Sequence, residues 1–206
     1  MLLERSYKPG NQSSDISTAI AEYYSTMVSM EAVSTLAEVA TQMAKAAHEH
    51  ALGEANFFQG KFAAAEHHFI KASQFAGEAL LVFSARTTQL AASDQISLVS
   101  GYADYYEIEA IEARAFALHE MGALEEAVLT HEIEISRTQA ATTNPAPDDF
   151  LDSFFKGHLW FAKATQMRRK AEIAERNGDQ GGAMQLRLEA EYAEQQSIKL
   201  NPQWRD

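Results

Sequence analysis

No cysteine occurs in this chain of 206 residues, so disulfide bonds and thiolate catalysis are excluded and a reducing compartment is favoured. Proline is also scarce: only four occur, at positions 9, 145, 147 and 202. Since proline breaks helices, nearly all of residues 14–200 can be helical. Residues 1–10 lack the apolar core of a secretory signal peptide, and we therefore expect a cytoplasmic protein.

The chain has no long apolar run and no excess of basic residues. Its longest apolar run covers residues 79–83, whereas roughly 20 residues are needed to cross a bilayer, so we expect no membrane insertion. Acidic residues number 29 against 17 Lys and Arg, which gives a formal net charge of −12. Binding to nucleic-acid phosphates requires a basic face, so we expect no nucleic-acid partner. The simpler role of this charge is to keep the protein in solution.

Apolar side chains recur at helical spacing along most of the chain, a pattern typical of an all-α protein. Residues 1–13 are predicted to form a flexible arm, and Ser14 or Asp15 can cap a first helix that ends near residue 27. The sequence leaves open whether the chain breaks near Ser29 or continues as one helix. With a separate first helix packed as an N-terminal cap, about seven helices are expected. The others form three antiparallel hairpins, at about residues 30–85, 94–141 and 148–200.

One short motif occurs three times, each time between two helical patterns. A glycine is followed two residues later by a larger side chain and five residues later by alanine. The three copies are Gly60–Ala65, Gly122–Ala127 and Gly178–Ala183. A helix hairpin that is repeated along one chain usually builds a scaffold rather than an active site.

Further positions are shared when the three copies are aligned on their glycines. Small residues stand seven positions before the glycine, at Gly53, Ala115 and Ala171. Twelve positions after the glycine the copies hold Ala72, Glu134 and Ala190. The first copy, over residues 52–72, closely resembles a tetratricopeptide repeat, and the resemblance extends roughly over residues 46–73, 108–135 and 164–191. In that family the small residues let the two helices of a repeat cross closely.

The spacing of the copies departs from that family. The glycines are 62 and 56 residues apart, whereas the family repeats every 34 residues or so, and the first helix of each hairpin must therefore be unusually long. The resemblance implies one tetratricopeptide-like α-solenoid domain over residues 14–206. An ordinary antiparallel helical bundle is the alternative.

Seven histidines raise the possibility of a metal site. Neither Glu-x-x-His nor His-Glu-x-x-His occurs, although His50 with Glu54 and His131 with Glu134 can each share one helix face. The sequence also lacks a Ser/His/Asp elbow, a phosphate loop and a dinucleotide fingerprint. We therefore expect no catalytic residue, no cofactor and no metal, and predict that the protein is not an enzyme.

The resemblance implies a concave groove that is lined by the first helices of the repeats and holds a peptide or a partner's helix. The glycine alignment carries these groove positions onto His50, Glu54, Phe57, Glu109, Glu112, Phe116, His119, Arg168, Glu172, Glu175 and Arg176. Acidic side chains outnumber basic ones in this set, and Phe57 and Phe116 can anchor apolar residues. We therefore expect a basic, amphipathic segment of a protein partner.

Three hypotheses for function follow. The leading one is a non-enzymatic interaction scaffold or adaptor that binds a peptide or helix in its groove. The second is a helical-bundle protein that binds a metal or ligand, or an enzyme, through its histidines and glutamates. The third is a structural subunit that forms homo-oligomers through adjacent aromatic pairs such as Phe154-Phe155 and Trp160-Phe161.

Overall fold

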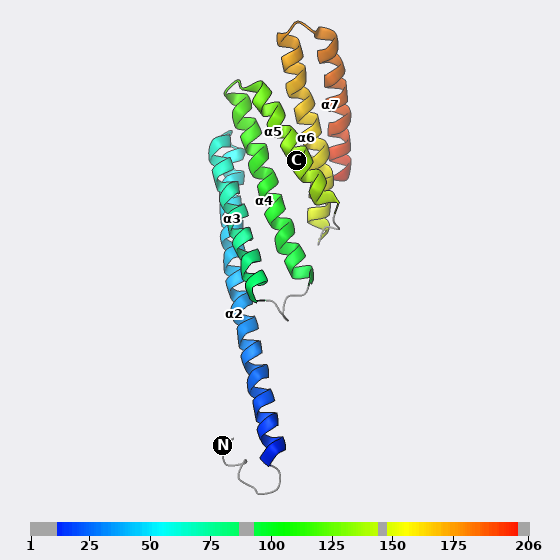
Figure 1. Cartoon of the computed structure of the whole chain (residues 1–206). Coiled ribbons are helices and arrows are strands. Elements are labelled where there is room, and N and C mark those ends of the chain that lie inside the picture. The colour runs from blue at the N-terminus through cyan, green and yellow to red at the C-terminus, as the bar shows by residue number, and fades with distance from the viewer. Residues whose placement is uncertain (1–11, 87–92, 144–147, 202–206) are drawn as a thin grey trace.

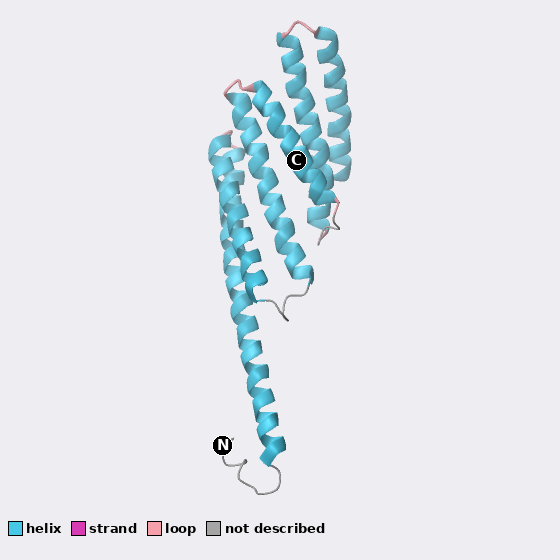
Figure 2. Cartoon of the chain, viewed as in Figure 1, coloured by secondary structure: helices cyan, strands magenta, loops and turns pink. Residues whose placement is uncertain are grey.

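A computed structural model of the chain describes residues 12–86, 93–143 and 148–201. These residues form six helices and no strand, which confirms the predicted all-α class (Figures 1 and 2). The helices are α2 (Gln12–Phe57), α3 (Phe62–Arg86), α4 (Ser93–Glu120), α5 (Leu124–Thr142), α6 (Asp149–Arg176) and α7 (Gln180–Leu200). None of them is long and apolar enough to cross a membrane.

The alternative left open near Ser29 is decided in favour of one continuous helix, so the described residues hold six helices rather than about seven. Helix α2 runs without interruption for 46 residues through Ser29. Residues 12–52 contain neither glycine nor proline, and a single serine in a helix interior costs less than about 1 kcal/mol. The helix already begins at Gln12, inside the predicted arm, and residues 1–11 lie outside the described part of the chain. The N-terminal part of α2 extends beyond the end of α3 (Figure 1).

The three turn glycines close three equivalent hairpin turns, as the repeated motif predicts. Gly60, Gly122 and Gly178 have φ angles of 73°, 80° and 81°, a conformation that glycine adopts without steric cost. After each glycine, the next amide donates a hydrogen bond of 2.9 Å to the carbonyl five residues earlier: Lys61 to Asn56, Ala123 to Leu118, and Asp179 to Ala174. This bond satisfies a carbonyl that the helix end would otherwise leave unpaired.

Small residues lie where the two helices of each hairpin meet. The alanines five residues after the turn glycines, Ala65, Ala127 and Ala183, are all buried. Gly53 lies so close to α3 that an added Cβ would approach the Phe69 ring to 2.5 Å. The predicted close crossing of the helices is therefore present in the structure.

Ala65→Leu is expected to destabilise the fold by about 1–3 kcal/mol, because it adds volume to a filled core. Ala65 is fully buried beside Phe69, Ala110 and Ala113. Thermal unfolding compared with wild type measures the effect. Ala64→Leu is the matched control, since Ala64 is exposed on the same helix. Equal melting temperatures for Ala65→Leu and Ala64→Leu would contradict this packing.

Each helix packs chiefly against its neighbours in sequence, and α4 also contacts α2 and α6. The three hairpin turns point the same way, and each successive hairpin is displaced further along the common direction (Figure 1). Residues that face each other on the first helices of neighbouring hairpins therefore lie at different sequence distances from their turn glycines. This stagger determines which residues lie together in the candidate site.

Candidate binding groove

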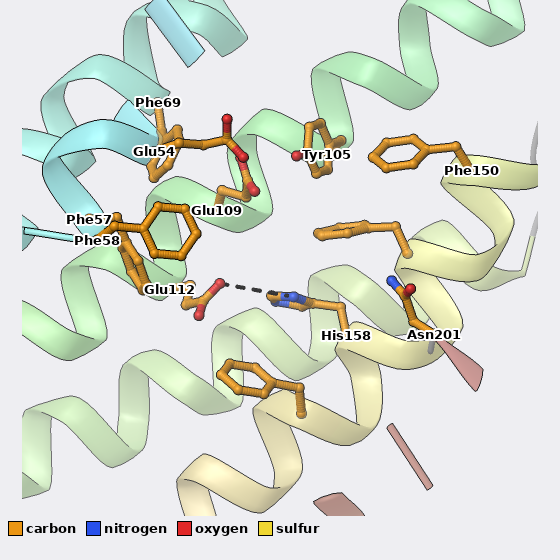
Figure 3. A pocket seen from close by; sticks show the side chains of 12 residues that line it. Glu54, Phe57, Phe58, Phe69, Tyr105, Glu109, Glu112, Phe150, His158 and Asn201 are labelled. Atoms are coloured by element: carbon orange, nitrogen blue, oxygen red, sulfur yellow. Dashed lines mark ion pairs between the residues drawn. The ribbon is translucent and has the colours of Figure 1, made fainter. Parts of the chain in front are cut away.

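A cavity of about 450 Å³ lies among α2, α3, α4 and α6 (Figure 3). Seven aromatic side chains line it: Phe57, Phe58, Phe69, Tyr105, Phe150, Phe154 and Phe161. The polar lining consists of Glu54, Glu109, Glu112, His158 and Asn201, with no Lys or Arg. The cavity therefore combines aromatic walls with three carboxyl groups.

Helical spacing explains how two of the helices supply these side chains. On α4, Tyr105, Glu109 and Glu112 are separated by four and three residues, so they share one face. On α6, the lining residues Phe150, Phe154, His158 and Phe161 follow the same rule. Asp148 caps the start of α6 by accepting a hydrogen bond of 2.7 Å from the Leu151 amide, which sets where this stripe begins.

His50 and Glu109 form an ion pair that joins α2 to α4. His50 Nε2 lies 2.6 Å from Glu109 Oε2, and the Tyr105 hydroxyl lies 3.0 Å from the same nitrogen. Burial alone would lower the pKa of His50, but the hydrogen bond and charge of Glu109 outweigh burial and raise it. Glu54 lies 3.8 Å from His50 Nδ1, and its side chain is 47% exposed. Glu54 is thus the most accessible carboxylate of this ion-pair cluster.

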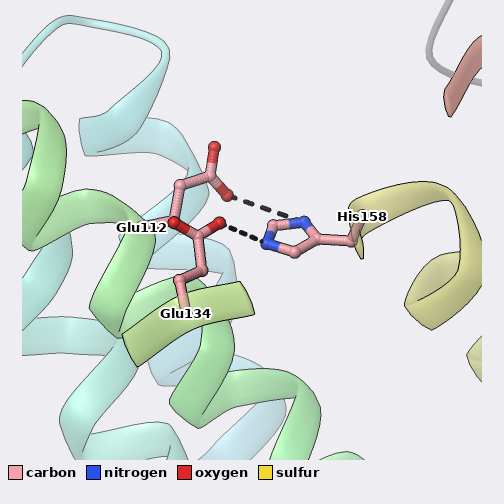
Figure 4. Close-up of side chains that lie close together, drawn as sticks. All are labelled: Glu112, Glu134 and His158. Carbon is pink, nitrogen blue, oxygen red and sulfur yellow. Dashed lines mark hydrogen bonds and ion pairs between the residues drawn. The ribbon is translucent and has the colours of Figure 1, made fainter. Parts of the chain in front are cut away.

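A second polar cluster lies deeper, between α4, α5 and α6 (Figure 4). Glu134 accepts hydrogen bonds from two imidazoles, at 2.6 Å from His131 Nδ1 and at 2.7 Å from His158 Nε2. His158 Nδ1 faces Glu112 Oε2 at 3.9 Å. The side chains of His131 and Glu134 are both 0% exposed. One carboxylate therefore holds two imidazoles in the protein interior.

The environment shifts the pKa values of this cluster in opposite directions. Burial raises the pKa of Glu112 to about 8, and the charge of His158 only partly opposes this effect. Burial would also raise the pKa of Glu134, but the hydrogen bonds from His131 and His158 outweigh it and lower that pKa. Burial would lower the pKa of His158, but Glu134 and then Glu112 raise it. The environment thus favours the protonated form of Glu112 and the charged forms of Glu134 and His158.

The structure brings only part of the predicted groove set to this cavity. Glu54, Phe57, Glu109 and Glu112 line it. His50 does not line the cavity but pairs with Glu109, which does. Phe116 packs against Phe57, Phe62 and Arg169 and does not line the cavity either. The predicted positions on α2 and α4 therefore lie in or beside the cavity, except His119 near the end of α4.

The remaining predicted positions lie elsewhere. Glu172 pairs with His119 at 3.0 Å and with Arg169 at 2.9 Å, and these hydrogen bonds outweigh burial and lower its pKa. Two of the other residues pair with α7: Arg168 with Glu194, and Glu175 with Arg187 at 2.8 Å. Arg176 is exposed at the end of α6. Residues on the N-terminal half of α6 line the cavity instead, because the third hairpin is displaced along the others (Figure 1).

Sequence reasoning did not single out Phe58, Phe69, Tyr105, Phe150, Phe154, His158, Phe161 or Asn201 as groove residues, nor the Glu112–His158–Glu134 cluster. A search for ligand pairs on one helix misses a cluster whose members come from three helices. One signal was available, because Glu134 stands where the other two hairpins have the buried alanines Ala72 and Ala190. A charged residue at a packing position indicates a specific role.

Comparison with known proteins gives no assignment: no family model matches the chain, and no curated protein or solved structure matches it either.

Proposed function

We propose that this protein is an interaction module of tetratricopeptide-like solenoid type, whose groove binds a protein segment carrying a Lys or Arg side chain. The observation that carries the proposal is the cavity lined by seven aromatic rings and three carboxyl groups, with no Lys or Arg among the lining residues. The three equivalent glycine turns and the sequential packing of the helices support the solenoid.

A cationic side chain satisfies both parts of this lining. Aromatic faces attract cations, with about 0.5–2 kcal/mol per contact depending on solvent exposure. The alkyl stem of Lys or Arg packs on apolar surface while its charged end reaches a polar group. Glu54 is exposed at the rim, and Glu109 lies further in beside Tyr105. The cavity of about 450 Å³ suits a small number of side chains of an extended or helical segment.

Phe150, rather than the predicted Phe116, is the apolar anchor in this proposal. Its side chain is 44% exposed and lies at the cavity wall, where its ring contacts Tyr102, Tyr105 and Phe154. The Phe116 ring is enclosed by Phe57, Phe62 and Arg169. Removing Phe150 therefore tests binding with less disturbance of the fold than removing Phe116.

A selection from a random peptide library tests the proposal without naming a partner in advance. We expect selected peptides to be enriched in Lys or Arg next to apolar residues. Phe150→Ala should reduce their affinity by roughly 10-fold or more, because exposed aromatic anchors tend to dominate binding energy. Leu129→Ala is the control, since Leu129 is an exposed apolar residue on α5 that does not line the cavity. Enrichment of acidic peptides, or equal losses for Phe150→Ala and Leu129→Ala, would contradict the proposal.

Self-association is a second candidate. Met184, Leu188 and Tyr192 are exposed and stand four residues apart on one face of α7. Such an apolar stripe can pack against a second copy of the chain. Light scattering of the purified protein tests this candidate, and a monomer mass at high concentration would exclude it.

A further inference from the structure

We propose that Glu112, Glu134 and His158 form a binding site for one first-row divalent transition metal ion. Each residue offers one ligand atom, and these three atoms lie within 4.8 Å of one another. The residues come from α4, α5 and α6, and both carboxyl groups point at the His158 ring, Glu112 toward Nδ1 and Glu134 toward Nε2 (Figure 4). Two ligand atoms at about 2.0–2.2 Å from one ion lie roughly 3.3–3.6 Å apart. Side-chain rotations would therefore have to move Glu134 Oε1 away from His158 Nε2, which is now 2.7 Å from it, to admit the ion.

The repeated packing of the hairpins does not require a carboxylate at the position of Glu134. Its position holds a buried alanine in the first and third hairpins, at Ala72 and Ala190. A fully buried carboxylate is costly unless it is paired or coordinates a metal. Glu134, the residue that departs from the repeat, therefore belongs to the only group of three potential metal ligands found in the described residues.

His131 orients the central carboxylate. Its Nδ1 donates to Glu134 Oε2 at 2.6 Å, which leaves Oε1 directed at His158 Nε2 at 2.7 Å. Metal-binding carboxylates are commonly held by a second hydrogen bond of this kind, which fixes the direction of the free oxygen. An ion would displace one proton from the His158 ring and one from Glu112, and the two carboxylates would then balance its two positive charges.

The site is accessible and has room for further ligands. Glu112 and His158 also line the cavity, so an ion can enter from it (Figure 3). Water from the cavity would complete the coordination, which is the arrangement of open rather than closed metal sites. One imidazole and two carboxylates without thiolate suit Zn²⁺, Mn²⁺ or Fe²⁺. The site shares Glu112 and His158 with the proposed groove, whereas the rim carboxylate Glu54 is not one of the ligands, so variants at Glu134 and at Glu54 distinguish metal binding from peptide binding.

Zn²⁺ titration of untagged, chelator-stripped protein tests the site. We expect one Zn²⁺ per chain by calorimetry and elemental analysis, and a higher melting temperature when the ion is bound. Glu112→Gln and His158→Gln should each weaken Zn²⁺ binding roughly 100-fold, and His131→Ala about 10–100-fold, because outer-shell partners alone have effects of that size. His119→Gln is the control, since His119 pairs with Glu172 outside the cluster and its loss should leave binding unchanged.

X-ray absorption of the Zn²⁺-loaded wild type keeps the proposal testable if a variant does not fold. We expect a first coordination shell of one imidazole with oxygen ligands. Failure of the wild type to bind Zn²⁺, two or more imidazoles in the shell, or unchanged binding in folded Glu112→Gln and His158→Gln would each overturn the proposal.

Discussion

Glu134→Ala is expected to destabilise the metal-free protein by about 3–5 kcal/mol at pH 6, the usual effect of removing one partner of a buried ion pair. The variant leaves His131 and His158 in the interior without their shared carboxylate. His158 must then lose its charge or remain unpaired, and His131 Nδ1 loses its hydrogen-bond acceptor. Urea unfolding in the presence of EDTA measures the loss.

Two further variants separate the buried pair from a general effect of mutation. Glu132→Ala is the control, because Glu132 is exposed on the same helix and pairs only with Lys170, at 3.5 Å. It should change the free energy of unfolding by less than about 0.5 kcal/mol. His158→Leu combined with Glu134→Ala should recover part of the loss, because it removes a buried charge together with its partner. Equal stability of Glu134→Ala and Glu132→Ala would contradict the buried cluster.

The stability of the metal-free protein should fall as pH rises from 6 to 8.5. Burial raises the pKa of Glu112 to about 8, so the folded protein keeps a proton that the unfolded chain has already released. The raised pKa of His158 acts in the same direction, because its stabilising charge is present at low pH and is lost as pH rises through the folded pKa. Glu134 has a lowered pKa, so its contribution is lost only at acidic pH.

Glu112→Gln should flatten this pH dependence, because glutamine carries no charge at any pH. Each unit of pKa shift corresponds to about 1.4 kcal/mol, so we expect the variant to gain roughly 2–4 kcal/mol relative to wild type between pH 6 and 8.5. Glu107→Gln is the control on α4, since Glu107 pairs with Arg137 at 2.6 Å and its side chain is 45% exposed. Urea unfolding across this pH range in EDTA gives the result. Parallel curves for Glu112→Gln and wild type would contradict a buried, protonated Glu112.

The sequence predicted the parts of the fold that depend on local signals. Gly60, Gly122 and Gly178 each form a turn because glycine reaches positive φ without strain. The small residues before and after them are buried because close helix crossings leave no room for larger side chains. The continuity of α2 through Ser29 was not decided by the sequence, since one serine neither breaks nor favours a helix strongly.

The site could be predicted only in part, because its geometry depends on how far one hairpin slides along the next. The glycine alignment led to Glu54 and Glu109, and both line the cavity because aligned positions on α2 and α4 lie near one another. On α6 the same alignment led to Arg168 and Glu175, which pair with α7, whereas Phe154 and His158 reach the cavity. That displacement results from side-chain packing between helices, and no local sequence signal encodes it.

Binding of matched peptides tests the central claim, that the groove accepts a cationic side chain, most directly. A peptide taken from the selection is compared with its twin in which citrulline replaces arginine, so that shape is kept and charge is lost. Calorimetry should show at least a 10-fold weaker affinity for the citrulline peptide, because it loses its cation–π and carboxylate contacts. Glu54→Gln should reduce the difference between the twins and the salt dependence of binding, since Glu54 is the exposed carboxylate at the rim. Equal affinities of the two peptides for the wild type would contradict the account.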